Sequence, residues 1–239
     1  MARFEMTPDS AFQAGALTIG ADRVTAFLRK VYGWMFVGLA VTAAVAFTIA
    51  GSPALISGIL GNPILFIVLI VAELGLVVAL SARVDRMAPR TAAVLFLAYS
   101  ALNGATLSVV LLAFTGASIA TTFAVAAGMF GALALYGTTT KKSLAGIGQF
   151  AVMGLFGLML AMVVGFFWKA PGLQFGISIV GVLVFTGLTA WDSQRLKEMA
   201  AVTPDGQVAG RAVVGALRLY LDFINLFLFL LRFLGARRD

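Results

Sequence analysis

Long apolar stretches separated by short polar segments make up most of the chain, and this pattern predicts helices that cross a bilayer. A helix needs about 20 residues to span the hydrocarbon. Seven stretches reach that length, at about 31–51, 64–82, 91–113, 117–137, 147–167, 173–192 and 212–234. Proline and glycine stand between them, as at Asn62-Pro63 and Pro171-Gly172, which is typical of turns between helices.

Composition strengthens this prediction and limits the domain organisation. Of the 239 residues, 61% are hydrophobic and 11% are charged, whereas soluble domains carry about 25% charged residues. The short polar segments leave no room for a separate soluble domain. We therefore predict an all-α integral membrane protein, with a cytoplasmic N-terminal tail at 1–30 and a seven-helix transmembrane domain at 31–235. The tail lacks the uninterrupted apolar core of a signal peptide.

Two missing residue types exclude several kinds of chemistry. Without cysteine there is no disulfide, thiol nucleophile or thiolate metal site. Without histidine most zinc chemistry, Ser-His catalysis and the usual physiological pH switch are excluded. The net charge of +7 comes from basic residues at the predicted membrane edges, so it does not indicate nucleic-acid binding.

The basic residues also predict the orientation, because cytoplasmic loops are enriched in Lys and Arg. They lie in the tail and after the second, fourth and sixth stretches, whereas the opposite loops hold only Lys169. This places the N-terminus in the cytoplasm. The last stretch conflicts with this enrichment of basic residues in the cytoplasm, because a full span would place three arginines outside: Arg232, Arg237 and Arg238. Either it spans fully or it enters and returns, and the full span is favoured.

Three of the ten acidic residues lie in apolar stretches, where a carboxylate is costly and normally faces a partner or water. Glu73 is near the midplane of its stretch. Asp192 closes the sixth stretch and Asp222 lies in the seventh, four residues after Arg218 and therefore on the same helix face. Because these two helices are consecutive and antiparallel, we expect the two aspartates to meet.

Structural alternatives exist for each acid. Asp192 could cap a loop, Asp222 could be the salt-bridge partner of Arg218, and Glu73 could be a protonated carboxyl satisfied within the bundle. Asn103 and Thr106 share a face of the third helix with Tyr99, where they could line a polar path or form interhelical hydrogen bonds.

Small residues every four positions predict helix contact faces, since they let backbones approach in lipid. They are Gly157, Ala161 and Gly165 in the fifth stretch and Ala124, Gly128 and Ala132 in the fourth.

Three stretches together resemble one family: YGTTTKKSLAGIGQF (136–150), TGLTAWDSQRLK (186–197) and LRLYLDFINLFLFLLRFLG (217–235). The opening RKVYGWMFVGLAVTA and the segment AELGLVVAL fit as well. The chain resembles the Bax inhibitor family, the transmembrane Bax inhibitor motif proteins, and in particular its bacterial branch.

The resemblance implies a seven-helix bundle with the last helix at its centre, and members described as pH-sensitive calcium leaks. It implies that Asp192 and Asp222 form the pH-sensing pair, that Glu73 is a pore or ion-site residue, and that Arg83 engages the pair. It also implies an inner-membrane location. Other members regulate cell death or, in bacteria, a membrane-bound ATP-dependent protease.

Residues and resemblance together favour a calcium leak gated by the aspartate pair, with Arg83 and Arg218 as its partners. Calcium prefers oxygen ligands, and Asp192 and Asp222 would contact it only transiently; no cofactor is expected. The path would use Glu73, Asn103 and Thr106. The alternative is a non-transporting regulator of a membrane protease. An enzyme is not expected, since the Gly-x-Gly-Asp element of intramembrane aspartyl proteases is missing.

Overall fold

The computed structural model describes the backbone of residues 8–19 and complete residues 20–83, 87–168 and 170–238. Within these ranges the chain is all-α, with one short 3-10 turn. The elements are α1 (Pro8–Ala50), α2 (Pro53–Leu60), α3 (Pro63–Arg83), α4 (Pro89–Ala113), α5 (Gly116–Thr139), α6 (Ala145–Phe167), α7 (Pro171–Val202), η2 (Asp205–Gln207) and α8 (Val208–Leu234).

Prolines fix the starts of several helices. The helices α2, α3, α4 and α7 each begin at a proline, whose fixed φ suits the first helical position and whose missing N–H has no partner to lose there. Within the described part of the chain, seven helices are long and apolar enough to cross a membrane. The predicted fold class, an all-α membrane bundle, is confirmed.

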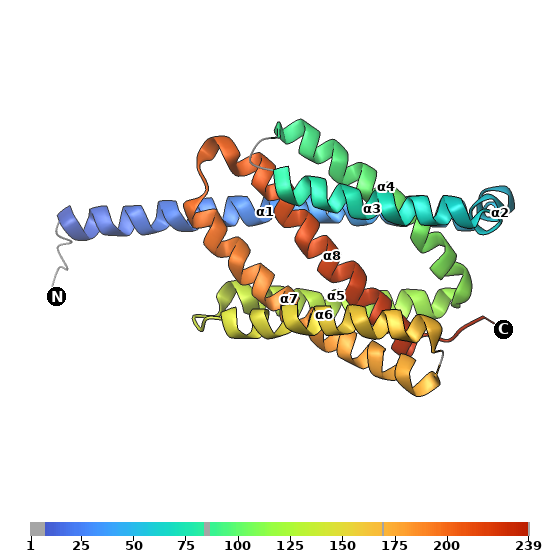
Figure 1. The fold of residues 1–239 in the computed structure, drawn as a ribbon. Helices are drawn as coiled ribbons and strands as arrows, with labels where there is room; N and C mark the ends of the chain where they lie inside the picture. Colours follow the sequence, from blue (N-terminus) through green and yellow to red (C-terminus); the bar gives the residue numbers. More distant parts are fainter. Residues whose placement is uncertain (1–7, 84–86, 169, 239) are drawn as a thin grey trace.

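The last helix lies at the centre of the bundle (Figure 1). It contacts α1, α4, α5 and α7. In its most apolar 18-residue window 78% of the residues are buried, against 44% or less in the other six spans. The central position expected for the last helix is therefore confirmed.

The two ends of the bundle can be told apart by their connections. We call the end that holds Thr115, Pro171 and Gly235 the distal end, and the end that holds Thr140 and Pro204 the proximal end. The helix α8 is continuous from Val208 to Leu234, and the chain beyond it bonds to the distal α4–α5 junction through Thr115 N–H and the Ala236 carbonyl, 3.1 Å apart. The helix thus crosses the bundle once and does not return.

Two helix boundaries and one additional helix differ from the sequence prediction. The helix α1 already begins at Pro8, inside the predicted 1–30 tail, because residues 9–30 contain no proline to break it. A short helix, α2, fills the connection after α1. The helix α7 continues to Val202, ten residues past its predicted end at 192, because SQRLKEMAAV is helix-forming although polar.

Close helix approach uses one of the predicted glycines and others that were not predicted. A Cβ at Gly165 on α6 would lie 2.8 Å from Gln174 Nε2 of α7, so the contact predicted for Gly165 is confirmed. A Cβ at Gly137 on α5 would collide with the backbone carbonyl of Ala190, and one at Gly148 on α6 would collide with the Trp191 ring. Both seat α7 against its neighbours. Gly128 and Gly157 instead face open space, so the prediction that these two lie on contact faces was wrong.

Candidate functional site

A hydrogen-bonded group joins α3 to α4 around Glu73. The Asn103 amide donates to Glu73 Oε2 at 3.2 Å, and the Thr106 hydroxyl donates to Glu73 Oε1. Asn103 is buried, while Glu73 and Thr106 are half-buried. The structure therefore brings together the three residues that were predicted to line an ion path, with both carboxylate oxygens accepting a hydrogen bond.

The same network continues to the centre of the bundle through Tyr220 of α8. The Tyr220 hydroxyl donates to Asn103 Oδ1 at 3.0 Å and lies 2.6 Å from the Thr42 hydroxyl of α1. Thr42 in turn donates to the Ser100 carbonyl at 2.8 Å. Tyr220 is fully buried and Thr42 is 4% exposed. We call Glu73, Asn103, Thr106, Tyr220 and Thr42 the polar network; it connects four helices.

The polar network has fewer hydroxyl hydrogens than contacts. Thr42 and Tyr220 each carry one hydrogen, but their oxygens make three contacts, with each other, with the Ser100 carbonyl and with Asn103 Oδ1. When Thr42 donates to Ser100 and Tyr220 donates to Asn103, the 2.6 Å contact between the two hydroxyls has no hydrogen. The network can therefore exchange donors without moving its oxygen atoms.

A second polar group lies where α7 meets α8. Asp222 is 5% exposed, and its Oδ2 is the one buried side-chain oxygen or nitrogen among the described residues that lacks a hydrogen-bond partner. Asp192, half-buried on α7, and Arg218, one turn earlier on α8, are close enough to interact with it electrostatically. We call Asp192 and Asp222 the aspartate pair.

The two polar groups share one short stretch of α8. Tyr220 and Asp222 are two residues apart, which turns their side chains about 200° around the helix axis. Tyr220 accordingly bonds toward α1 and α4, whereas Asp222 interacts with Asp192 of α7. A shift of α8 would act on both groups at once.

Two of the structural alternatives for the aspartates do not hold. Asp192 caps no loop, since α7 continues ten residues beyond it to Val202. Asp222 forms no salt bridge with Arg218: over the described residues, the one ion pair within 4.0 Å joins Arg23 and Asp205, at 2.8 Å.

The arginines differ in how they relate to the pair. Arg218 interacts electrostatically with both aspartates, and Arg195 of α7 interacts with Asp192 while its guanidinium lies 4.7 Å from the centre of the Trp191 ring. Arg83 ends α3 with an exposed side chain that bonds to no other residue in the described ranges. Its role at the pair remains a prediction.

Gln194, in the same TAWDSQ segment as Asp192, has a structural role that the sequence did not reveal. Its side-chain carbonyl accepts from Leu144 N–H at 2.8 Å, and its amide donates to the Lys142 carbonyl at 2.9 Å. Gln194 is buried, and so is Leu144. One side chain thus fixes the α5–α6 connection to α7, two residues from Asp192.

Sequence reasoning also missed Tyr220, Thr42 and Arg195. Tyr220 could have been found, since it lies two residues before Asp222 in the quoted LYLDFIN stretch and a buried tyrosine hydroxyl needs a partner. Thr42 gave no signal beyond being polar in an apolar helix. Arg195 was missed because it lies in the part of α7 beyond the predicted helix end at 192.

The aspartate pair alone does not form a resident metal site. No group of three or more His, Cys, Asp or Glu side chains gathers in the part of the chain that the structure describes, and Ca²⁺ normally takes 6–8 oxygen ligands. The roles of Asp192 and Asp222 as transient calcium ligands therefore remain predictions.

The fold and its buried polar groups define a multi-pass α-helical membrane protein, and comparison with known proteins identifies its family. Residues 24–239 match the family described as "Inhibitor of apoptosis-promoting Bax1". The chain belongs to this family, the Bax inhibitor family, as its sequence stretches indicated.

Bacterial relatives align over almost the full chain. The inner membrane protein YbhL of Escherichia coli K12 is 46% identical over 215 residues, covering 89% of this chain and 92% of YbhL. An uncharacterized protein of Borreliella burgdorferi is 44% identical over 215 residues, covering 89% and 93%. One from Caulobacter vibrioides is 42% identical over 243 residues, covering 94% and 97%.

Proposed function

We propose that the protein is a pH-sensitive calcium leak in which the aspartate pair acts as a latch between α7 and α8. The observation that carries this proposal is the buried Asp222 carboxyl, whose Oδ2 lacks a hydrogen-bond partner beside the charge of Asp192. A buried polar atom without a partner is expensive, so a central helix that keeps one has a reason other than packing.

A proton shared with Asp192 would supply the partner that Asp222 Oδ2 lacks. Two carboxylates held close together resist double ionisation and titrate as a unit. The protonated partner can donate to the other, which would give Asp222 Oδ2 its missing hydrogen bond and tie α8 to α7. Arg218 and Arg195 oppose this by favouring the charged forms. The balance sets the pH at which the latch opens.

The polar network supplies oxygen atoms for a permeant cation on the other side of α8. Glu73, Asn103 and Thr106 present carboxylate, amide and hydroxyl oxygens, the ligand types that calcium prefers. When the latch opens, movement of α8 would displace Tyr220 and release Asn103 Oδ1 for a cation. Calcium is the substrate in this proposal, and no cofactor takes part.

The proposed setting is the inner membrane with the N-terminus in the cytoplasm. The location follows the name of the relative YbhL. The orientation follows the basic residues, among them Lys141, Lys142 and Lys197, which lie at or near the proximal end. The proximal end would then be cytoplasmic.

Calcium entry into liposomes loaded with a calcium dye tests the function directly. We expect the purified full chain to raise the entry rate above that of protein-free liposomes, and to do so in a pH-dependent way. Liposomes reconstituted with an equal mass of heat-denatured protein serve as the control for non-specific leakage. A rate equal to that of protein-free liposomes at every pH would contradict the leak and favour the alternative, a regulator that binds a membrane-bound ATP-dependent protease.

A further inference from the structure

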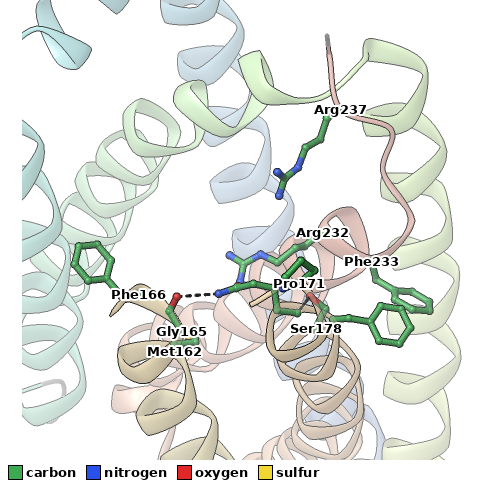
Figure 2. A pocket seen from close by; sticks show the side chains of 10 residues that line it. Met162, Gly165, Phe166, Pro171, Ser178, Arg232, Phe233 and Arg237 are labelled. Carbon is green, nitrogen blue, oxygen red and sulfur yellow. Dashed lines mark hydrogen bonds between the residues drawn. The ribbon is translucent and has the colours of Figure 1, made fainter. Parts of the chain in front are cut away.

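A cavity of about 820 Å³ lies at the distal end, away from both polar groups described above. It is lined by the end of α6, the start of α7, the end of α8 and the segment that follows α8 (Figure 2). Its wall is mostly apolar, yet Arg232 and Arg237 both contribute side chains, and Figure 2 shows the two guanidinium groups directed into the same space.

Each arginine is held by its surroundings. The guanidinium of Arg232 lies 5.7 Å from the centre of the Phe229 ring, a cation–π distance. The segment that carries Arg237 is fixed by backbone bonds: Thr115 N–H donates to the Ala236 carbonyl and Arg238 N–H to the Ala113 carbonyl, both at 3.1 Å.

The two charges share the wall of the cavity. Arg232 and Arg237 are close enough to repel each other electrostatically, and no Asp or Glu of the described residues lines the cavity. Two cations held together without a counter-charge are unfavourable and indicate an anionic ligand.

The start of α7, which lines the cavity through Pro171 and Gln174, has free backbone donors in its first turn. Its N-cap residue, Ala170, provides no side-chain cap. Because Pro171 has no N–H, the free backbone donors of the first turn are those of Gly172 and Leu173, while Gln174 N–H already bonds to the Ala170 carbonyl at 3.1 Å. A helix N-terminus of this kind favours a negative group.

Exposed aromatic residues indicate the depth of the cavity in the bilayer. Phe166, Phe167 and Trp168 at the end of α6 and Phe233 at the end of α8 all have exposed side chains. Tryptophan is enriched where lipid headgroups meet the hydrocarbon, and Trp168 directly follows α6. The cavity therefore opens at headgroup level, with its apolar wall of Met162 and neighbouring aromatics reaching toward the acyl chains.

We propose that this cavity binds an anionic phospholipid, with the phosphate between Arg232 and Arg237 and an acyl chain along the apolar wall. An open cavity with a positively charged rim and an apolar wall matches a phospholipid, which has an anionic headgroup and apolar acyl chains. The site also explains why these arginines stand at the distal end, which in the proposed orientation is the outer side and is normally poor in basic residues.

Native mass spectrometry of the full chain in detergent tests the site. The protein is titrated with phosphatidylglycerol or with phosphatidylcholine of the same acyl chains, and the dissociation constant of the first bound lipid is measured. We expect phosphatidylglycerol to bind more tightly. Arg232→Gln and Arg237→Gln should each weaken it about fivefold, the effect of one basic residue at an anionic lipid surface, and leave phosphatidylcholine unchanged.

Arg238→Gln is the matched control, since it removes the same charge from the same segment but Arg238 does not line the cavity. Equal weakening by Arg238→Gln, or equal binding of the two lipids by the parent, would overturn the proposal. Displacement of phosphatidylglycerol by millimolar inorganic phosphate would show a free-anion site and overturn the lipid assignment. If Arg232→Gln fails to fold, Arg232→Lys should fold and retain the preference, and Arg237→Gln, beyond the helix, provides an independent test.

Discussion

Replacing Tyr220 with phenylalanine tests whether the polar network holds the centre of the bundle together. The substitution keeps the ring, which makes edge-to-face contacts with Phe96 and Tyr99 at centroid distances of 5.7 Å each. It removes only the hydroxyl, which contacts Thr42 at 2.6 Å and Asn103 Oδ1 at 3.0 Å. The packing is therefore unchanged while the network loses its central atom.

The expected cost follows from which groups lose a donor. Thr42 remains satisfied because it donates to the Ser100 carbonyl. Asn103 Oδ1 is left buried without its donor, so the loss is that of one hydrogen bond plus an orphaned acceptor. An orphaned buried group costs about 1–3 kcal/mol in soluble proteins, and hydrogen bonds between membrane helices contribute about 0.6–1.7 kcal/mol. We expect Tyr220→Phe to lower the free energy of unfolding by about 1–2 kcal/mol.

Reversible unfolding in mixed micelles of mild detergent and sodium dodecyl sulfate, followed by circular dichroism, measures this loss. Tyr136→Phe is the matched control, because Tyr136 on α5 is 49% exposed, and it should be neutral. Two results together would contradict the argument: a Tyr220→Phe variant as stable as the parent protein, and an Asn103→Ala variant less stable than the parent protein. The hydrogen bond from Tyr220 to Asn103 would then not contribute to stability.

Three further substitutions test other parts of the account. Gly137→Ala should destabilise by about 1–3 kcal/mol through overpacking against α7, whereas Gly128→Ala on the same helix should be neutral or stabilising; equal effects in micelle unfolding would contradict the assigned contact. Glu73→Gln should change calcium flux in liposomes several-fold with near-normal expression, and unchanged flux across the pH range would make Glu73 structural. Gln194→Ala should speed amide exchange at Leu144, measured by hydrogen–deuterium exchange. Unaltered protection at Leu144 would mean that Gln194 does not fix the α5–α6 connection to α7.

The sequence was sufficient for the architecture because apolar length is a strong signal in a membrane protein. The seven spans followed from hydropathy, and the central position of α8 followed from the family resemblance. The helical extension to Val202 was missed because the prediction relied on hydropathy, which marks where a helix leaves the lipid and not where it ends. That extension is what removes Asp192 from a loop.

The candidate site was predicted residue by residue but not as a network. Glu73, Asn103 and Thr106 were identified separately, by charge and by helical spacing, and hydrogen bonding was left as an alternative to an ion path. Their connection to Thr42 through Tyr220 depends on how α1, α4 and α8 are rotated about their axes. Rotation is set by close contacts such as that of Gly104 on α4, where an added Cβ would collide with the Thr42 carbonyl of α1. Small residues alone did not show it: Gly128 and Gly165 both recur in four-residue patterns, but an added Cβ would meet α7 at Gly165 and open space at Gly128.

The pH profile of calcium flux in the aspartate variants tests the central claim most directly. Flux is measured from about pH 5 to about pH 8, where a coupled carboxylate pair can exchange its shared proton, for the parent, Asp192→Asn, Asp222→Asn and the double variant. A shared-proton latch predicts that each single variant flattens or displaces the profile and that the double variant adds little to either, because the pair titrates as a unit. Two single variants that both kept the parent profile would contradict the latch and leave the aspartates a structural role.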